Sequence, residues 1–169
     1  MDKNKTHMTD ELLPIKRSRK KLKIGDVFVI QPKESLYFYG KVIEVNDKFQ
    51  GFSVDAVVIF IYKKNTAKLE MPDYLDPNDL LIPPQIVNLR GWTMGYFYTV
   101  GNMELTNDEM NLDYGFKDTR KVKPRFLTSM GEELDHEPSI VGIYAIGSYG
   151  STSYEVTKEL EEHPELLDV

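Results

Sequence analysis

The residues whose types suit catalysis are few, and their spacing limits the chemistry they could perform. His136 lies between Asp135 and Glu137, so an imidazole alternates with two carboxylates. None of the three histidines has a second histidine at the spacing of a metal-ligand pair, so this segment would need ligands from elsewhere to hold a cation. His136 would serve as a general base only beside a nucleophile, which the sequence does not identify. We interpret the segment as a solvated acidic loop.

The other motifs for catalysis or cofactor binding are equally weak. The chain has no cysteine, which excludes disulfides, thiolate metal sites and a cysteine nucleophile. It has no GxSxG, Walker or SxxK motif. Residues 147–152 could cradle a phosphate between a strand and a helix, although a flexible turn explains the same residues. We therefore predict no catalytic residue, no cofactor and no metal, and an enzyme built on this turn is the third choice.

Two adjoining groups of residues suit binding to another protein. The first contains Arg90, Trp92, Tyr96 and Tyr98, and these residue types dominate interface hot spots. Trp92 could equally be an anchor of the core. Strand alternation would place Tyr96 and Tyr98 on one face and Phe97 on the other, so the two tyrosines, or Phe97 if the faces are reversed, would contact the partner.

The second group consists of four carboxylates that follow the aromatic segment: Glu104, Asp108, Glu109 and Asp113. On a loop they would present a negative surface to a basic partner. The alternative is an ordinary solvated loop.

The elements that must position these residues are mostly strands. Short runs rich in β-branched and aromatic residues, bounded by turn formers, predict strands at 27–30, 37–45, 54–62, 85–89, 96–100, 114–116, 125–127 and 140–146. The run 57–61 is apolar throughout, which is typical of a central strand buried on both faces. Gly40 suggests a bulge or bend inside the second strand.

Two helical segments are predicted. Residues 76–81 resemble a short helix with Asp76 as its N-cap, stopped by Pro83 and Pro84. Thr152 and Glu155 form a capping-box pattern, which predicts a C-terminal helix over 153–162. Together these elements predict a mainly β fold, α+β at the margin: an antiparallel, partly open SH3-like barrel or sandwich with a short C-terminal helix.

Charge divides the chain into two parts. Residues 1–23 carry eight basic and three acidic side chains, a charge of +5, whereas the rest carries 13 basic and 24 acidic side chains, a charge of −11. We expect residues 1–21 to be a flexible basic leader and residues 22–169 to be a single domain. The basic run 16–23 could be a nucleic-acid arm or a localisation signal, or only a solvated segment. The acidic body makes nucleic acid an unlikely ligand except through this arm.

The longest apolar run spans residues 56–62, far short of the roughly 20 residues that cross a bilayer. The N-terminus shows no signal-peptide pattern. We therefore expect a cytoplasmic protein with no membrane partner.

Three segments are similar to a known family. Residues 23–28 (Lys-Ile-Gly-Asp-Val-Phe), 39–43 (Tyr-Gly-Lys-Val-Ile) and the stretch from Leu81-Ile82-Pro83-Pro84 to Gly91-Trp92-Thr93-Met94-Gly95-Tyr96-Phe97 resemble the Immunity protein 26 family. The resemblance covers about residues 22–102. It implies a mainly β bacterial protein that neutralises the cognate toxin of a polymorphic-toxin system, and it assigns no active site.

The residues and the resemblance favour the same class. We predict a non-catalytic immunity protein whose partner is a cognate toxin domain, with a nuclease as the favoured toxin because its basic cleft would attract the acidic body. The alternative is a small SH3-like nucleic-acid-binding module that uses the basic N-terminal arm.

Overall fold

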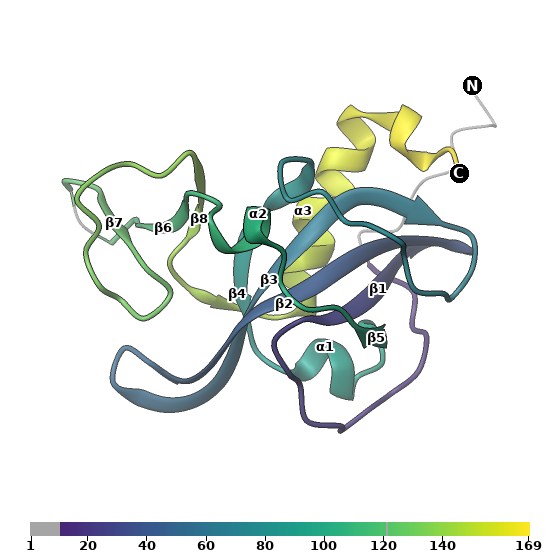
Figure 1. Ribbon diagram of the computed structural model, residues 1–169, viewed down its shortest axis with the longest axis horizontal. Coiled ribbons are helices and arrows are strands. Elements are labelled where there is room, and N and C mark those ends of the chain that lie inside the picture. Colours follow the sequence, from purple (N-terminus) through teal and green to yellow (C-terminus); the bar gives the residue numbers. More distant parts are fainter. Residues whose placement is uncertain (1–10, 121) are drawn as a thin grey trace.

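The computed structural model describes residues 11–120 and 122–169, and its chain forms two β-sheets and three α-helices (Figure 1). The larger sheet has the strand order β5-β1-β2-β3-β4-β9, with bounds Tyr98–Asn102, Asp26–Lys33, Leu36–Phe49, Phe52–Thr66, Leu80–Val87 and Ile146–Gly147. The smaller sheet has the order β7-β6-β8, with bounds Arg125–Leu127, Tyr114–Asp118 and Ile140–Ile143. The helices are α1 (Arg90–Thr93), α2 (Asn107–Met110) and α3 (Tyr149–Glu162), followed by the 3₁₀ helix η1 (Pro164–Leu167).

Antiparallel pairing dominates both sheets. Strands β1 to β4 follow one another as antiparallel neighbours, and β5 returns to pair with β1. Among the strands of the described residues, only β4 with β9 and β6 with β8 pair in parallel. The larger sheet ends at β5 on one side and at β9 on the other, so it is not a closed barrel. The predicted fold class is confirmed.

The larger sheet is buried on both faces. Val57, Ile59 and Ile61 of β3 face a first core that also contains Val156 and Leu160 of α3. The alternate residues of β3 face a second core, shared with the smaller sheet. In Figure 1, α3 (yellow) crosses the larger sheet and the smaller sheet lies to the left. The prediction that residues 57–61 form a doubly buried strand is confirmed.

Gly40 is required by the ring of Phe28 on the neighbouring strand. The two residues are paired across β1 and β2, and a Cβ on Gly40 would lie 2.4 Å from a ring carbon of Phe28. The pairing of β2 with β3 shifts between Phe38 and Gly40, as expected for a bulge. The predicted irregularity is confirmed.

The helix predicted over residues 76–81 is wrong. Asp76 and Asp79 belong to a turn, closed by a backbone hydrogen bond of 3.1 Å from Asp79 N to Asp76 O, and β4 begins at the next residue. Pro83 and Pro84 lie inside β4 rather than ending a helix. They are tolerated because the ladder between β3 and β4 shifts at this point.

Helix α3 begins at Tyr149, four residues earlier than predicted, and Ser148 is its N-cap. Thr152 therefore lies within the helix instead of capping it. Its hydroxyl is buried and donates a hydrogen bond of 2.7 Å to Oε1 of Gln85 on β4. The predicted capping box is wrong, although the helix itself is present.

The described part of the expected leader packs on the domain. Leu12 is buried in the first core, and the backbone N–H groups of Leu13, Ile15 and Ser18 donate to carbonyls of β1 and of the α1 region. This differs from the flexible leader that charge alone predicted. Residues 1–10 lie outside the described residues.

Candidate functional site

A buried polar cluster fixes the acidic segment that the sequence pointed to. Lys41 of β2 shares its face of the sheet with Tyr62 of β3, and the charged end of Lys41 lies beneath α2. Its Nζ donates to Oε1 of Glu109 at 2.6 Å and to the backbone oxygen of Glu104 at 3.0 Å. The Tyr62 hydroxyl donates to the other carboxylate oxygen of Glu109. The cluster thus ties α2 to the centre of the larger sheet.

Glu109 also caps its own helix. Its carboxylate accepts a hydrogen bond of 2.9 Å from the backbone N–H of Thr106, while the Thr106 hydroxyl accepts one of 3.1 Å from the backbone N–H of Glu109. Burial opposes ionisation of Glu109, but the hydrogen bonds from Lys41, Thr106 and Tyr62 outweigh burial and hold the pKa of the carboxyl below its ordinary value. Glu109 is thus an ionised structural residue.

The expected four-carboxylate surface therefore needs a correction. Glu109 is 1% exposed and cannot contact a partner. Glu104, Asp108 and Asp113 are exposed and do point to solvent. The sequence contained the signal, since Thr106 and Glu109 match the capping-box pattern ahead of a short helix. The buried lysine that completes the cluster left no local signal.

Asp113 is joined to the acidic loop by a histidine. His136 Nε2 lies 2.7 Å from Oδ1 of Asp113, and His136 Nδ1 lies 2.8 Å from Oδ1 of Asp135. Because both ring nitrogens face carboxylate oxygens, the arrangement suits the doubly protonated imidazolium, and the bonds to Asp113 and Asp135 raise the pKa of His136. In the part of the chain that the structure describes, no group of residues is arranged to hold a metal ion.

The aromatic group is divided between core and surface. Trp92 is 2% exposed; its ring lies 5.0 Å from those of Phe28 and Phe97, and its indole N–H donates to the Thr99 hydroxyl. Trp92 is therefore a core anchor and not a contact residue. Arg90, in contrast, is exposed at the start of α1.

The two tyrosines of the group do not share a face. Tyr96 precedes β5 and packs against the first core, where its ring stacks on Tyr149 of α3 at 4.4 Å. Tyr98 is the first residue of β5 and packs against the second core. Both are partly exposed, while Phe97 is fully buried. The expectation that Tyr96 and Tyr98 share a face is wrong, because the strand begins only at Tyr98.

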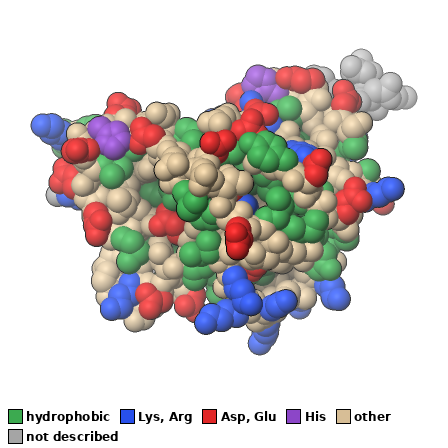
Figure 2. All heavy atoms as spheres, viewed as in Figure 1, with side chains coloured by type: hydrophobic (Ala, Val, Ile, Leu, Met, Phe, Trp, Pro, Cys, Tyr) green, Lys and Arg blue, Asp and Glu red, His purple; other side chains and the backbone are tan. Residues whose placement is uncertain are grey.

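Sequence reasoning missed a second source of acidic residues next to α2. The loop before β4 brings Tyr74, half exposed, close to Asp76 and Asp108, and burial together with these two carboxylates raises the pKa of the Tyr74 hydroxyl. Asp76 and Asp79 line one shallow hollow with Tyr74, Lys63 and Lys64, and Lys63 Nζ lies 3.8 Å from Oδ1 of Asp79; Asp108 and Asp113 line the next hollow. We call this set, Tyr74, Asp76, Asp79, Asp108 and Asp113, the acidic surface. Figure 2 shows acidic side chains near the position of α2, whereas Lys and Arg gather at the lower edge.

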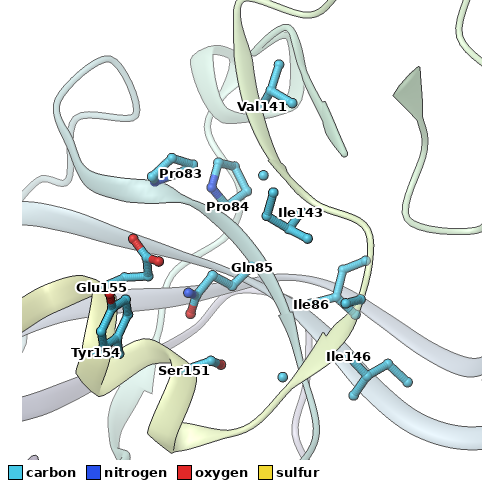
Figure 3. Close-up of a pocket in the computed structure, with 13 residues that line it drawn as sticks. Pro83, Pro84, Gln85, Ile86, Val141, Ile143, Ile146, Ser151, Tyr154 and Glu155 are labelled. Atoms are coloured by element: carbon cyan, nitrogen blue, oxygen red, sulfur yellow. The ribbon is translucent and has the colours of Figure 1, made fainter. Parts of the chain in front are cut away.

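An apolar groove of about 600 Å³ lies between α3, β4 and the strands β8 and β9. Figure 3 shows Pro84, Ile86, Ile143 and Ile146 along its walls, with Tyr154 at the helix side. The turn over residues 147–152, considered above for phosphate, forms the end of this groove and the first turn of α3. There the Ser151 hydroxyl donates to the backbone oxygen of Ser148 at 2.7 Å.

The fold is a mainly β domain, and its acidic surface is formed by α2 and the loop before β4. A model of the Immunity protein 26 family matches residues 23–126, more than half of the 169-residue chain, and the chain belongs to this family. It is therefore an immunity protein of a toxin system. The match extends beyond the resemblance seen at about 22–102 and includes α2 and the buried Glu109. The curated proteins and the solved structures searched contain no match.

Among the described residues, no helix is both long enough and apolar enough to cross a membrane.

Proposed function

We propose that the protein binds a cognate toxin domain in the bacterial cytoplasm and neutralises it without catalysis, and that the toxin is a nuclease. Membership in the Immunity protein 26 family supports the binding role. The acidic surface supports the choice of toxin, because a cleft that binds phosphodiesters is basic and complements clustered carboxylates.

The acidic surface can present its charge because the buried cluster holds α2 in place. Lys41 and Glu109 fix the helix that carries Asp108, and the loop before β4 brings Asp76 alongside. Tyr74 adds an exposed aromatic ring among these carboxylates, which is the composition of an interface hot spot with a charged rim. Glu104 lies between β5 and α2 and extends the same negative region along the chain.

Growth rescue tests the binding role. The C-terminal domain encoded by the adjacent gene would be expressed in a bacterial host with and without this protein. We expect toxicity that this protein relieves, together with co-purification of the two chains. Toxicity that persists in its presence would contradict the proposal.

A second assay tests the nature of the toxin. The purified toxin domain would be incubated with RNA and DNA, and this protein would be added up to an equimolar amount. We expect cleavage of one nucleic acid and its suppression near equimolarity. If this protein relieves the toxicity but the toxin cleaves neither RNA nor DNA, the nuclease assignment is refuted and the neutralising role stands.

A further inference from the structure

The hairpin formed by β2 and β3 projects beyond the rest of the larger sheet (Figure 1). Its end, residues 48–53, is called the hairpin tip here. It lies past the last pairs that β2 forms with β1 and that β3 forms with β4. Phe49 pairs with Phe52, which leaves a two-residue turn at 50–51 with positive φ at both positions, as in a tight hairpin turn. The hairpin tip is therefore a narrow projection.

The hairpin tip carries an aromatic side chain in an exposed position. Phe52 is 70% exposed. The hairpin behind it is held firmly, because the ring of Phe49 lies 4.8 Å from that of Tyr144 and the Asn46 side-chain amide donates to the Ser129 hydroxyl at 3.1 Å. A large apolar ring on a fixed projection suits insertion into an apolar pocket, since little conformational entropy is lost on binding.

The same chain has a pocket of this kind in the apolar groove between α3, β4, β8 and β9. Two large side chains that line it are exposed, Ile143 of β8 by 57% and Tyr154 of α3 by 62%. Pro84 and Ile146 extend its apolar wall, as Figure 3 shows. Its volume of about 600 Å³ is within the range of pockets that hold small-molecule ligands, so an aromatic side chain fits.

Charge also matches between the hairpin tip and the groove. Glu155 of α3 is the one charged residue among those that line the groove. Lys48 pairs with Ser53 next to the turn, so strand alternation directs it to the face of the hairpin opposite Phe52. Neither Lys48 nor Glu155 takes part in the ion pairs found within residues 11–120 and 122–169. A tip seated in the groove can thus place Phe52 against Ile143 while Lys48 approaches Glu155 on the helix side.

We propose that the groove binds the hairpin tip of a second copy of this chain, with Phe52 in the groove and Lys48 paired with Glu155. This association covers the exposed apolar side chains of both features and gives each of the two charges a partner. The acidic surface shares no residue with the hairpin tip or the groove. Self-association therefore goes beyond toxin binding and does not depend on it.

The positions of the two features suit a closed dimer. Tyr144, which contacts Phe49 of the hairpin, lies in the chain between the groove residues Ile143 and Ala145. The hairpin and the groove are therefore neighbours on one molecule. A two-fold axis that passes between them lets each copy insert its Phe52 into the other, which makes the contact reciprocal and stops growth at two chains.

Light scattering coupled to size-exclusion chromatography tests the proposal with the full chain. We expect the mass of two chains at high protein concentration and a shift toward one chain on dilution, as mass action requires. A mass of one chain at every concentration would overturn the proposal. Growth beyond two chains would overturn the reciprocal contact.

Phe52→Ser tests the apolar insertion. It removes the side chain from both grooves of a dimer, and we expect the dissociation constant to rise about 100-fold or more. Because Phe52 is exposed, the diluted variant should unfold at the same temperature as the unmodified protein. Met110→Ser removes another exposed apolar side chain, 60% exposed on α2, and should leave the dissociation constant unchanged. Equal dissociation constants for the two variants would overturn the proposal.

A charge exchange tests the orientation of the tip in the groove. Lys48→Glu and Glu155→Lys each place like charges opposite one another, and each should weaken the dimer about tenfold or more. The double variant Lys48→Glu/Glu155→Lys restores opposite charges across the contact and should recover most of the affinity. A double variant that associates no more tightly than the single variants would show that the two residues do not meet, and the proposal would fail.

Discussion

Lys41 and Glu109 are 68 positions apart in the chain, yet their charged groups lie 2.6 Å apart inside the protein. The pair joins the middle of β2 to a one-turn helix that the larger sheet would otherwise hold only weakly. It also decides which carboxylates of the acidic segment remain available to a partner.

Breaking this pair should destabilise the protein strongly. Glu109→Gln leaves the Lys41 charge buried without a counter-charge, and we expect a loss of about 3–5 kcal/mol in the free energy of unfolding, measured by urea denaturation. The double variant Lys41→Met/Glu109→Gln should recover a large part of that loss. Asp108→Asn, on the exposed face of the same helix, should change stability by only about 0.5 kcal/mol. A double variant no more stable than Glu109→Gln would contradict this account.

The Lys41–Glu109 pair should also make the free energy of unfolding depend on pH. The pKa of Glu109 is lower in the folded protein than its ordinary value of 4.5, so ionised Glu109 stabilises the fold above that pH. This contribution is lost as the pH falls below 4.5 through the folded pKa. The stability difference between the unmodified protein and Glu109→Gln should therefore be largest near neutral pH and should narrow in acid. A difference that stays constant across urea titrations at several pH values would refute the assignment.

His136 should titrate above its ordinary pKa of 6.5, because Asp113 and Asp135 hold its protonated form. A raised pKa means that the charged contacts are fully formed below pH 6.5 and are lost as the pH rises through the folded value. NMR titration of the ring protons measures this directly. Asp113→Asn should lower the pKa of His136. Glu137→Gln removes the carboxylate that follows His136 in the chain, and it should lower the pKa of His136 less. Equal effects of the two substitutions would argue against the Asp113 contact.

Charge reversal on the acidic surface should slow association with the toxin. Asp76→Lys/Asp108→Lys places two positive charges where a basic partner approaches, and we expect the association rate at low salt to fall about tenfold or more. Glu161→Lys/Glu162→Lys makes the same change in net charge at the exposed end of α3 and serves as the control. Stopped-flow or surface-based kinetics would measure both. Equal rates for the two variants would remove the acidic surface from the interface.

Two glycine substitutions should have opposite effects. Gly40→Ala brings a methyl group to 2.4 Å from the Phe28 ring, which must then move within the first core, and we expect a loss of about 1–3 kcal/mol. Gly150→Ala lies in the first turn of α3 with nothing within 4 Å of the added Cβ, so better helix propensity should leave stability equal or about 0.5–1 kcal/mol higher. Thermal unfolding compares the two. A tolerated Gly40→Ala would show that Phe28 repacks freely.

The strands could be predicted because their signals are local. The run from Ala56 to Tyr62 is apolar on both faces of its strand, so both faces must be buried. The structure provides a core on each side of the sheet. The class of fold followed from the same local patterns, whereas the family followed from the resemblance of three segments to its members.

The site could be predicted only in part, because its residues depend on distant partners. Thr106 with Glu109 and Thr152 with Glu155 match the same capping pattern, but only the first pair caps a helix. Thr152 is instead buried against Gln85, 67 positions away. Which carboxylate turns inward likewise depends on Lys41 in another strand.

The boundary of the family match and the boundary of the folding unit are different. The match ends at residue 126, before α3 contributes Val156 and Leu160 to the first core. A gene trimmed to the matched residues would therefore encode a sheet whose first-core face, rich in aromatic residues, is exposed to solvent. Such a fragment should aggregate on expression. The immunity protein would then be recovered from inclusion bodies instead of as a folded chain.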